Sequence, residues 1–202
     1  STLRITLPEI YLEDNNVSER IENIHRNMEK YLEENIFDEY KNALVYVERT
    51  QNNGIIRQGI VGKIDLEEYS YEKGSTSQVR ATEATVIERI PPRVKIRKNA
   101  SLELPHIMIL IDDEKKNIIE PLSALSENMQ KLYDFELMQN GGKIKGYLIP
   151  EDVQKNIFAE LDELGEYNHG LKDVPEFLYA MGDGNHSLAT AKEYYESLKR
   201  EN

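Results

Sequence analysis

Residues 176–187, Glu-Phe-Leu-Tyr-Ala-Met-Gly-Asp-Gly-Asn-His-Ser, join an apolar run to a glycine-rich loop, and a helical pattern follows from Leu188. We expect a strand over Glu176–Met181, a tight turn at the glycines and a helix to the end of the chain. Such a helix points unpaired N–H groups and the positive end of its dipole at the mouth of the loop. The stretch therefore predicts a sheet with a helix packed on it, and an environment that favours a phosphate or carboxylate group.

The side chains of this loop suit anion chemistry. Asp183 is a candidate catalytic base or metal ligand, and His186 is a candidate phosphate donor or acid–base catalyst. The alternative is a plain strand-to-helix turn that Asn185 or Ser187 caps, and both interpretations stay open. A Walker loop is excluded because no Gly-Lys-Ser/Thr follows, and Ser187 replaces the third glycine of a dinucleotide-binding pattern. The candidate phosphate-binding residues here are Gly182, Gly184, Asn185 and Ser187.

A second candidate site is basic. Ser75–Ser101 carries a local excess of positive charge inside a chain of formal net charge -12. Arginine forks bind phosphate or carboxylate in a bidentate fashion, so Arg80, Arg89 and Arg93 are candidate phosphate ligands. Glu83 is either their ion-pair partner or a general base or metal ligand. The alternative, which composition alone favours, is a solvated and salt-bridged basic face.

Periodicity predicts the rest of the fold. Helical spacing predicts a helix over Val17–Glu34 with a capping box at Asn16, and Asn52-Asn53-Gly54 predicts a hairpin turn. Strands and helices are mixed rather than alternating, which favours an α+β fold with a mixed sheet and helices packed on it. Residues 1–202 form one such domain, either undivided or with a boundary near 74–102. The other expected strands are the hairpin strands at 43–50 and 55–64, a buried strand at His106–Ile111 and a strand at Lys143–Ile149. The other expected helices run from Pro121 to about Tyr133 and from Pro150 to about Leu164. Leu66–Gly74 is expected to be irregular and tyrosine-rich, and Pro91-Pro92 keeps the basic segment from forming one helix.

Composition excludes several classes of protein. The 202 residues include no cysteine, so disulfides, thiolate zinc sites and cysteine nucleophiles are ruled out. The net charge of -12 repels phosphate backbones and disfavours a nucleic-acid partner. No apolar run approaches the roughly 18–20 residues that cross a bilayer, and no signal-peptide pattern opens the chain, so we expect a cytoplasmic protein without a membrane partner. Ser1 in place of Met, and a last helix that simply stops, suggest a fragment of a longer protein.

Two blocks resemble the uncharacterised bacterial family catalogued as domain of unknown function 1015. They are Arg80-Ala-Thr-Glu-Ala-Thr-Val-Ile-Glu-Arg-Ile-Pro-Pro-Arg93 and Gly182-Asp-Gly-Asn-His-Ser-Leu-Ala-Thr-Ala-Lys192, and the runs Leu104–Asp113 and Lys131–Phe135 resemble the family too. The likeness spans nearly the whole chain. Members are longer at both ends, which agrees with a fragment.

The motif around His186 is in turn similar to the phosphate-binding motif of the ParB/sulfiredoxin-like superfamily. This resemblance implies a ParB/sulfiredoxin-like element at the C-terminal end that holds nucleotide phosphates at residues 184–187. Relatives usually carry Arg where this chain has His186 or Ser187, so Arg80, Arg89 or Arg93 would have to supply the fixed positive charge. Sulfiredoxin's own chemistry is excluded because it needs a cysteine.

These observations favour a nucleotide- or phosphometabolite-binding domain that acts as a metal-assisted phosphotransferase, with Mg²⁺ and a nucleoside phosphate as cofactors. The competing hypothesis is a non-catalytic protein-binding or structural module, whose acidic surface and Tyr69–Tyr71 segment face a protein partner. Binding of DNA by analogy with ParB is a third hypothesis, which the net charge disfavours.

Overall fold

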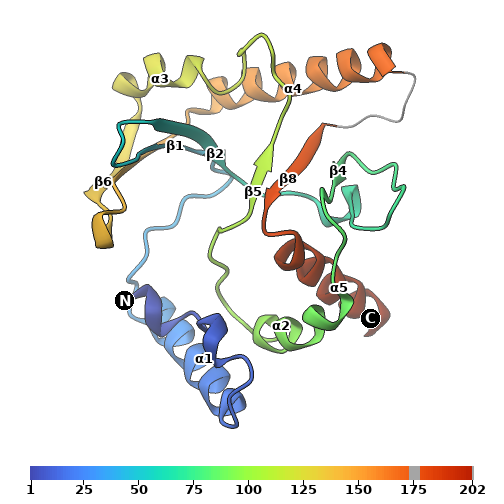
Figure 1. Ribbon diagram of the computed structural model, residues 1–202. Coiled ribbons are helices and arrows are strands. Elements are labelled where there is room, and N and C mark those ends of the chain that lie inside the picture. The colour runs from blue at the N-terminus through green and yellow to red at the C-terminus, as the bar shows by residue number, and fades with distance from the viewer. Residues whose placement is uncertain (173–177, 202) are drawn as a thin grey trace.

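The protein folds around two sheets. The computed structural model describes residues 1–172 and 178–201, and within them lie two four-stranded sheets with helices around them (Figure 1). One sheet is antiparallel, with the order β2-β1-β7-β6, and the other is mixed, with the order β3-β4-β8-β5. The α+β class is confirmed. The strands divide into two sheets because the chain after β2 leaves the first sheet and pairs in parallel with β8 through β4.

The antiparallel sheet is built on the predicted hairpin. Its strands are β1 (Val45–Thr50), β2 (Ile56–Val61), β6 (Gln130–Glu136) and β7 (Lys143–Leu148). Gly54, with φ of 81°, lies in the turn between β1 and β2, so the predicted hairpin is confirmed. Asn53 does not share the positive φ, and residues 51–55 make the connection longer than a two-residue turn. Helices α3 (Pro121–Leu125) and α4 (Glu151–Lys172) cover one face of this sheet (Figure 1). The core between them contains Tyr46, Ile118, Leu122, Met129, Tyr147, Ile149 and Ile157.

The mixed sheet carries the C-terminal helix. Its strands are β3 (Tyr69–Ser70), β4 (Val79–Arg80), β5 (Met108–Leu110) and β8 (Tyr179–Asp183). Helix α5 (Asn185–Glu201) packs on one face, where Leu188 joins a core of Tyr69, Val79 and Met181. Helix α2 (Ile90–Arg97) packs against α5. The loop between β8 and α5 lies beside the chain that leads into α2.

Helix α1 (Val17–Glu33) forms a third cluster, in which Ile24, Met28 and Tyr31 pack with Ile5 and with residues 100–104. The helix is confirmed, but the capping box is wrong. The Asn16 side chain makes no capping bond, and its Oδ1 accepts instead from Nε of Arg20 at 3.1 Å. The short 3-10 helices are Thr2–Arg4, Glu9–Tyr11, Leu66–Glu68, Ile87–Arg89, Ser126–Asn128 and Met138–Asn140.

The structure corrects the expected helix from Pro121 to Tyr133. Helix α3 ends at Leu125, and β6 begins at Gln130 because its backbone pairs with β7 from Gln130 to Glu136. Pairing across a sheet thus prevails over the local helix preference of this segment. Helix α4 continues beyond the expected end at Leu164, to Lys172.

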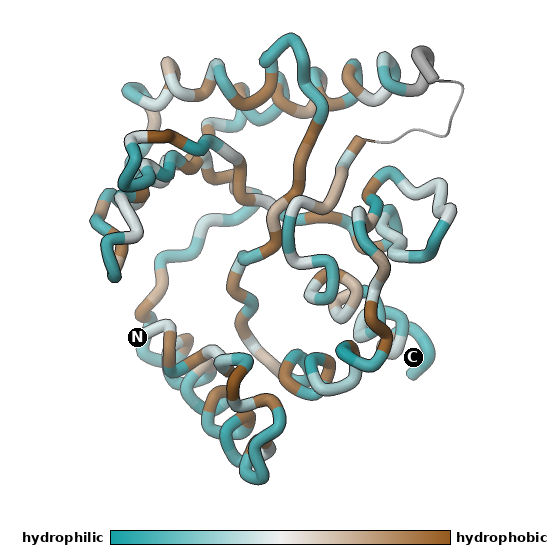
Figure 2. The backbone as a smooth tube through the Cα atoms, in the orientation of Figure 1, coloured by the Kyte–Doolittle hydropathy of each residue, from teal (hydrophilic) through white to brown (hydrophobic). Residues whose placement is uncertain are grey.

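Two other expectations change in the mixed sheet. Figure 2 shows β5 and the chain before it as hydrophobic, yet Met108 and Leu110 are 44% and 53% exposed, so β5 is not a buried strand. The segment expected to be irregular contains β3, where Tyr69 is only 1% exposed. Tyr69 therefore cannot face a protein partner. Strand β8 begins at Tyr179, and Glu176 and Phe177 of the predicted strand lie outside the described residues.

Candidate functional site

Gly184 sets the geometry of the predicted loop. Its φ is +89°, and a Cβ atom there would lie 3.3 Å from the Cα of Ile107. A side chain would therefore strain the backbone and press on the neighbouring segment. Helix α5 starts directly afterwards at Asn185, so the predicted strand–turn–helix unit is confirmed.

Three hydrogen bonds fix residues 82–86 across the start of α5. The Thr82 N–H donates to Oδ1 of Asn185 at 3.2 Å, and its hydroxyl donates to the Met181 carbonyl at 2.7 Å. The Val86 N–H donates to Nε2 of His186 at 3.1 Å. Residues 80–93 and 182–192, which are two separate blocks in the sequence, are thus joined by hydrogen bonds into one structural unit.

These bonds assign different tasks to Asn185 and His186. Asn185 is 5% exposed and its Oδ1 is occupied by Thr82, so it holds the loop and does not cap α5. Nε2 of His186 accepts a hydrogen bond, so the neutral ring carries its proton on Nδ1. That Nδ1–H has no acceptor in the part of the chain that the structure describes, so it can donate to an anion.

The first turn of α5 keeps free donors. The Leu188 N–H reaches the Gly184 carbonyl at 3.0 Å, but the N–H groups of Asn185, His186 and Ser187 have no acceptor among the described residues. Uncapped amides at the positive end of a helix dipole attract anions.

Asp183 is the last residue of β8, two positions before α5 begins. Its carboxylate is exposed and accepts from the N–H of Gly184 at 2.8 Å. In the part of the chain that the structure describes, no group of three or more His, Asp or Glu side chains is arranged to hold a metal ion. One carboxylate together with phosphate oxygens and water is nevertheless a usual environment for Mg²⁺. Asp183 therefore fits a metal that arrives with a phosphorylated ligand.

The candidate arginines are distributed over different elements. Arg80 lies on β4 opposite Ala180 of β8, and its Nε donates to the Ser77 carbonyl at 2.6 Å. Arg89 is exposed at the start of α2. Arg93 is committed elsewhere, because its guanidinium forms an ion pair of 2.5 Å with Glu9 and donates to the Arg89 carbonyl. Glu83 is exposed and has no ion-pair partner among the residues described.

Thr82, Thr85 and Val86 are the site residues that sequence reasoning missed. Two of them act through backbone N–H groups, which no side-chain pattern reveals. Oγ1 of Thr85 is buried and has no hydrogen-bond partner among the described residues. A buried hydroxyl of this kind calls for an explanation such as a bound water or ligand. The available signal was the spacing of Thr82 and Thr85 inside the arginine-rich block.

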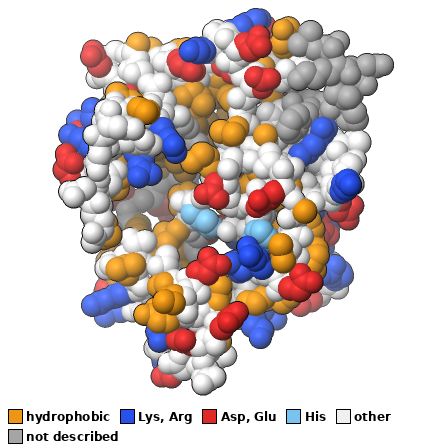
Figure 3. All heavy atoms as spheres, in the orientation of Figure 1, with side chains coloured by type: hydrophobic (Ala, Val, Ile, Leu, Met, Phe, Trp, Pro, Cys, Tyr) orange, Lys and Arg blue, Asp and Glu red, His pale blue; other side chains and the backbone are white. Residues whose placement is uncertain are grey.

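The surroundings of the site are mixed in charge. Figure 3 shows acidic and basic side chains interspersed on this face, not gathered into a patch of one sign. Two cavities lie elsewhere: one of about 430 Å³ between α1 and α2, and one of about 230 Å³ lined by Tyr71 and Glu193. None of the helices that the structure describes combines the length and the apolar character needed to cross a membrane.

Comparison with known proteins gives one result. No curated protein and no solved structure matched the chain. A family model described as "Protein of unknown function (DUF1015)" matches residues 1–202, and the chain therefore belongs to this family.

Proposed function

We propose that the protein binds the phosphate groups of a nucleotide or phosphorylated metabolite at the N-terminus of α5, and transfers a phosphoryl group with the help of Mg²⁺. The observation that carries the proposal is the uncapped first turn of α5, with residues 82–86 hydrogen-bonded across it. The expected likeness of this loop to the phosphate-binding motif of ParB/sulfiredoxin-like proteins supports the same assignment.

The residues divide the work by chemistry. The N–H groups of residues 185–187 and Nδ1–H of His186 donate to phosphate oxygens. Gly182 and Gly184 let the loop that carries them pass close to Leu110 and Ile107. Asp183 would hold Mg²⁺, which would supply charge neutralisation at the transferring group. Arg80, one strand away, and Arg89 add positive charge. Exposed Glu83 accepts the proton of an incoming hydroxyl, whose oxygen bonds to phosphorus while the bond from phosphorus to the oxygen of the leaving phosphate ester or diphosphate breaks.

Calorimetric titration with ATP, ADP and inorganic phosphate, with and without Mg²⁺, tests the binding. Thermal unfolding provides a second readout, because a ligand at a hundred times its dissociation constant stabilises a protein by about 2.7 kcal/mol. Asp183→Asn should abolish the Mg²⁺-dependent part of the binding and leave the Mg²⁺-independent part. Wild-type binding by Asp183→Asn in Mg²⁺ would remove its assigned role.

A pair of variants at Asn185 separates folding from binding. Asn185→Asp keeps an oxygen for the Thr82 N–H and places a negative charge at the helix start, where it suits the dipole. We expect this variant to fold and to reject phosphate by repulsion. Arg97→Gln, which alters an ion pair with Glu103 at the other end of α2, is the matched control. Equal phosphate affinity in Asn185→Asp and wild type would overturn the proposed site.

One observation favours a second function, a non-catalytic protein-binding module. Met108 and Leu110 are exposed on the same face of β5, and a Cβ on Gly182 would lie within 3.4 Å of both. An exposed apolar group of this kind often marks a contact surface. No binding of any nucleotide, together with loss of a partner in Leu110→Glu, would favour this function over phosphate binding.

A further inference from the structure

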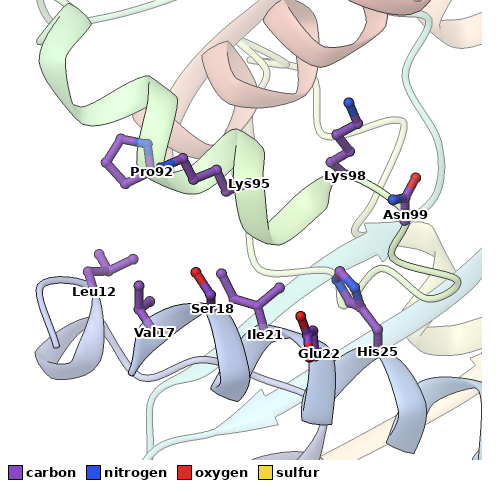
Figure 4. Close-up of a pocket in the computed structure, with 10 residues that line it drawn as sticks. All are labelled: Leu12, Val17, Ser18, Ile21, Glu22, His25, Pro92, Lys95, Lys98 and Asn99. Atoms are coloured by element: carbon purple, nitrogen blue, oxygen red, sulfur yellow. The ribbon is translucent and has the colours of Figure 1, made fainter. Parts of the chain in front are cut away.

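A cleft separates α1 from α2. Its volume is about 430 Å³, within the range of small-molecule sites (Figure 4). Two contacts hold its ends: Glu9 pairs with Arg93 at 2.5 Å, and Nε2–H of His25 donates to the Ile96 carbonyl at 2.9 Å. The buried residues of the two helices pack elsewhere, Ile24 and Met28 of α1 in the N-terminal cluster and Ile90 at the start of α2. The facing surfaces therefore remain open between the two contacts.

The walls of the cleft combine apolar and charged side chains. In Figure 4, Val17, Ile21 and His25 rise from α1 toward α2, and Pro92 and Lys95 lie on the α2 side. Leu12 extends the apolar part at the end near Val17. A ligand in this cleft would meet aliphatic surface along α1 and an ammonium group along α2.

The cleft holds one ammonium group beside its apolar wall. Lys95, Lys98 and Glu22 line the cleft, and none of the three has an ion-pair partner in the ranges 1–172 and 178–201. Figure 4 shows Lys98 turned away from α1, so Lys95 is the cation nearest the apolar wall. An unpaired ammonium beside aliphatic side chains complements a molecule with an apolar body and one negative group.

We propose that the cleft between α1 and α2 binds an amphipathic monocarboxylate, an alkyl or aryl carboxylic acid whose body lies on Val17 and Ile21 and whose carboxylate pairs with Lys95. The site uses other elements than the loop before α5 and does not depend on the proposed phosphate binding. Glu22, on the same helix as Ile21, opposes the ligand charge and limits its affinity.

Titration of the ¹⁵N-labelled chain with octanoate, followed by NMR, tests this site. Octanol and octylamine are the neutral and cationic probes of equal length, and all three are used below their aggregation limits. We expect saturable shifts of amides at residues 17–25 and 92–99, with octanoate binding more tightly than octanol and octanol more tightly than octylamine. Shifts scattered over the surface, or centred on residues 182–187, would overturn the proposal without bearing on phosphate binding.

Substitutions show whether each charged side chain strengthens or weakens octanoate binding. Lys95→Gln should weaken octanoate binding by about 1.5- to fivefold, the usual range for an exposed ion pair, and leave octanol binding unchanged. Glu22→Gln should strengthen octanoate binding about twofold. Ile21→Ala should weaken octanoate and octanol alike. Lys30→Gln, which removes an exposed charge of α1 outside the cleft, is the control. Equal effects of Lys95→Gln and Lys30→Gln would contradict the assignment.

Discussion

The Val86 N–H donates to Nε2 of His186 at 3.1 Å, although 100 residues separate the two in the chain. This bond and the bond from Thr82 to Asn185 connect a loop without regular structure to the first turn of α5. The side chains of the first two residues of α5 thus hold a neighbouring segment, while their own N–H groups have no acceptor among the residues that the structure describes. Any ligand at the start of α5 would meet residues 82–86 in a fixed position.

His186→Ala should release this loop. The Val86 N–H loses its acceptor, so its hydrogen exchange should speed up by about tenfold, the equivalent of a bond worth about 1.4 kcal/mol. Exchange measured by NMR at single residues checks this, and ¹⁵N shifts of the wild-type ring should report the Nδ1–H tautomer. His106→Ala, at an exposed ring bonded to the Leu104 carbonyl, should leave Val86 unchanged. Identical Val86 exchange in both variants would contradict the contact.

Gly146→Ala should destabilise the antiparallel sheet. A Cβ at Gly146 would overlap the ring of Tyr133 on the adjacent strand, and overpacking of this kind costs about 1–3 kcal/mol. Gly146 and Gly59 both lie opposite Val47 of β1, on the two neighbouring strands. Gly59 is the matched control, because a Cβ there would meet no atom within 4 Å. Denaturant unfolding should separate the two alanine variants. Equal midpoints would show that the Tyr133 ring does not lie over Gly146.

Tyr46→Phe should cost about 1–3 kcal/mol of stability, because it removes two hydrogen bonds of a buried hydroxyl, one of them to a carboxylate. The Tyr46 hydroxyl donates to Glu48 at 2.9 Å and accepts from Nε2 of Gln58 at 2.8 Å, and Tyr46 is fully buried. Denaturant unfolding at pH 7 measures the loss. Tyr40→Phe, at an exposed ring, should change little.

Alkaline pH gives Tyr46 a second signature. Burial, together with the hydrogen bond to Glu48, raises the pKa of Tyr46 from 10.0 to about 12. The unfolded chain loses the proton first, so the contribution is complete below pH 10 and is lost as the pH rises to about 12. Wild type should therefore lose more stability than Tyr46→Phe across this window. Parallel curves would contradict the raised pKa.

Glu67→Gln should lower stability at neutral pH and not in acid. The hydrogen bond from Lys199, at 2.7 Å, and then the one from Tyr195 lower the pKa of Glu67 to about 2. The carboxylate therefore stabilises the fold above its ordinary pKa of 4.5, and this contribution disappears as the pH falls to about 2. Unfolding of wild type and variant from pH 7 downward should converge. Glu151→Gln, in an exposed pair with Lys155, should show a smaller difference at every pH.

The sequence predicted the elements that depend on neighbouring residues. Helix α1 follows from the spacing of Ile24, Met28 and Tyr31, and the hairpin follows from Gly54. The turn into α5 follows from Gly184, whose positive φ suits no other residue as well. The boundary near 74–102 and the roles of the site residues remain predictions.

Long-range contacts decided the rest. Lys131–Phe135 forms a strand because β7 supplies hydrogen-bond partners. Met108 is exposed because none of the elements that the structure describes covers that face of β5. Only part of the candidate site could be predicted from the sequence. The sequence shows that His186 lies at the start of a helix, but it does not show that the Val86 N–H donates to the His186 ring. The sequence by itself determined the local backbone geometry, because glycine positions and the spacing of apolar residues act over only a few residues. Only the tertiary structure decided which distant N–H groups satisfy which side chains, because every buried polar group must find its partner in the folded chain as a whole.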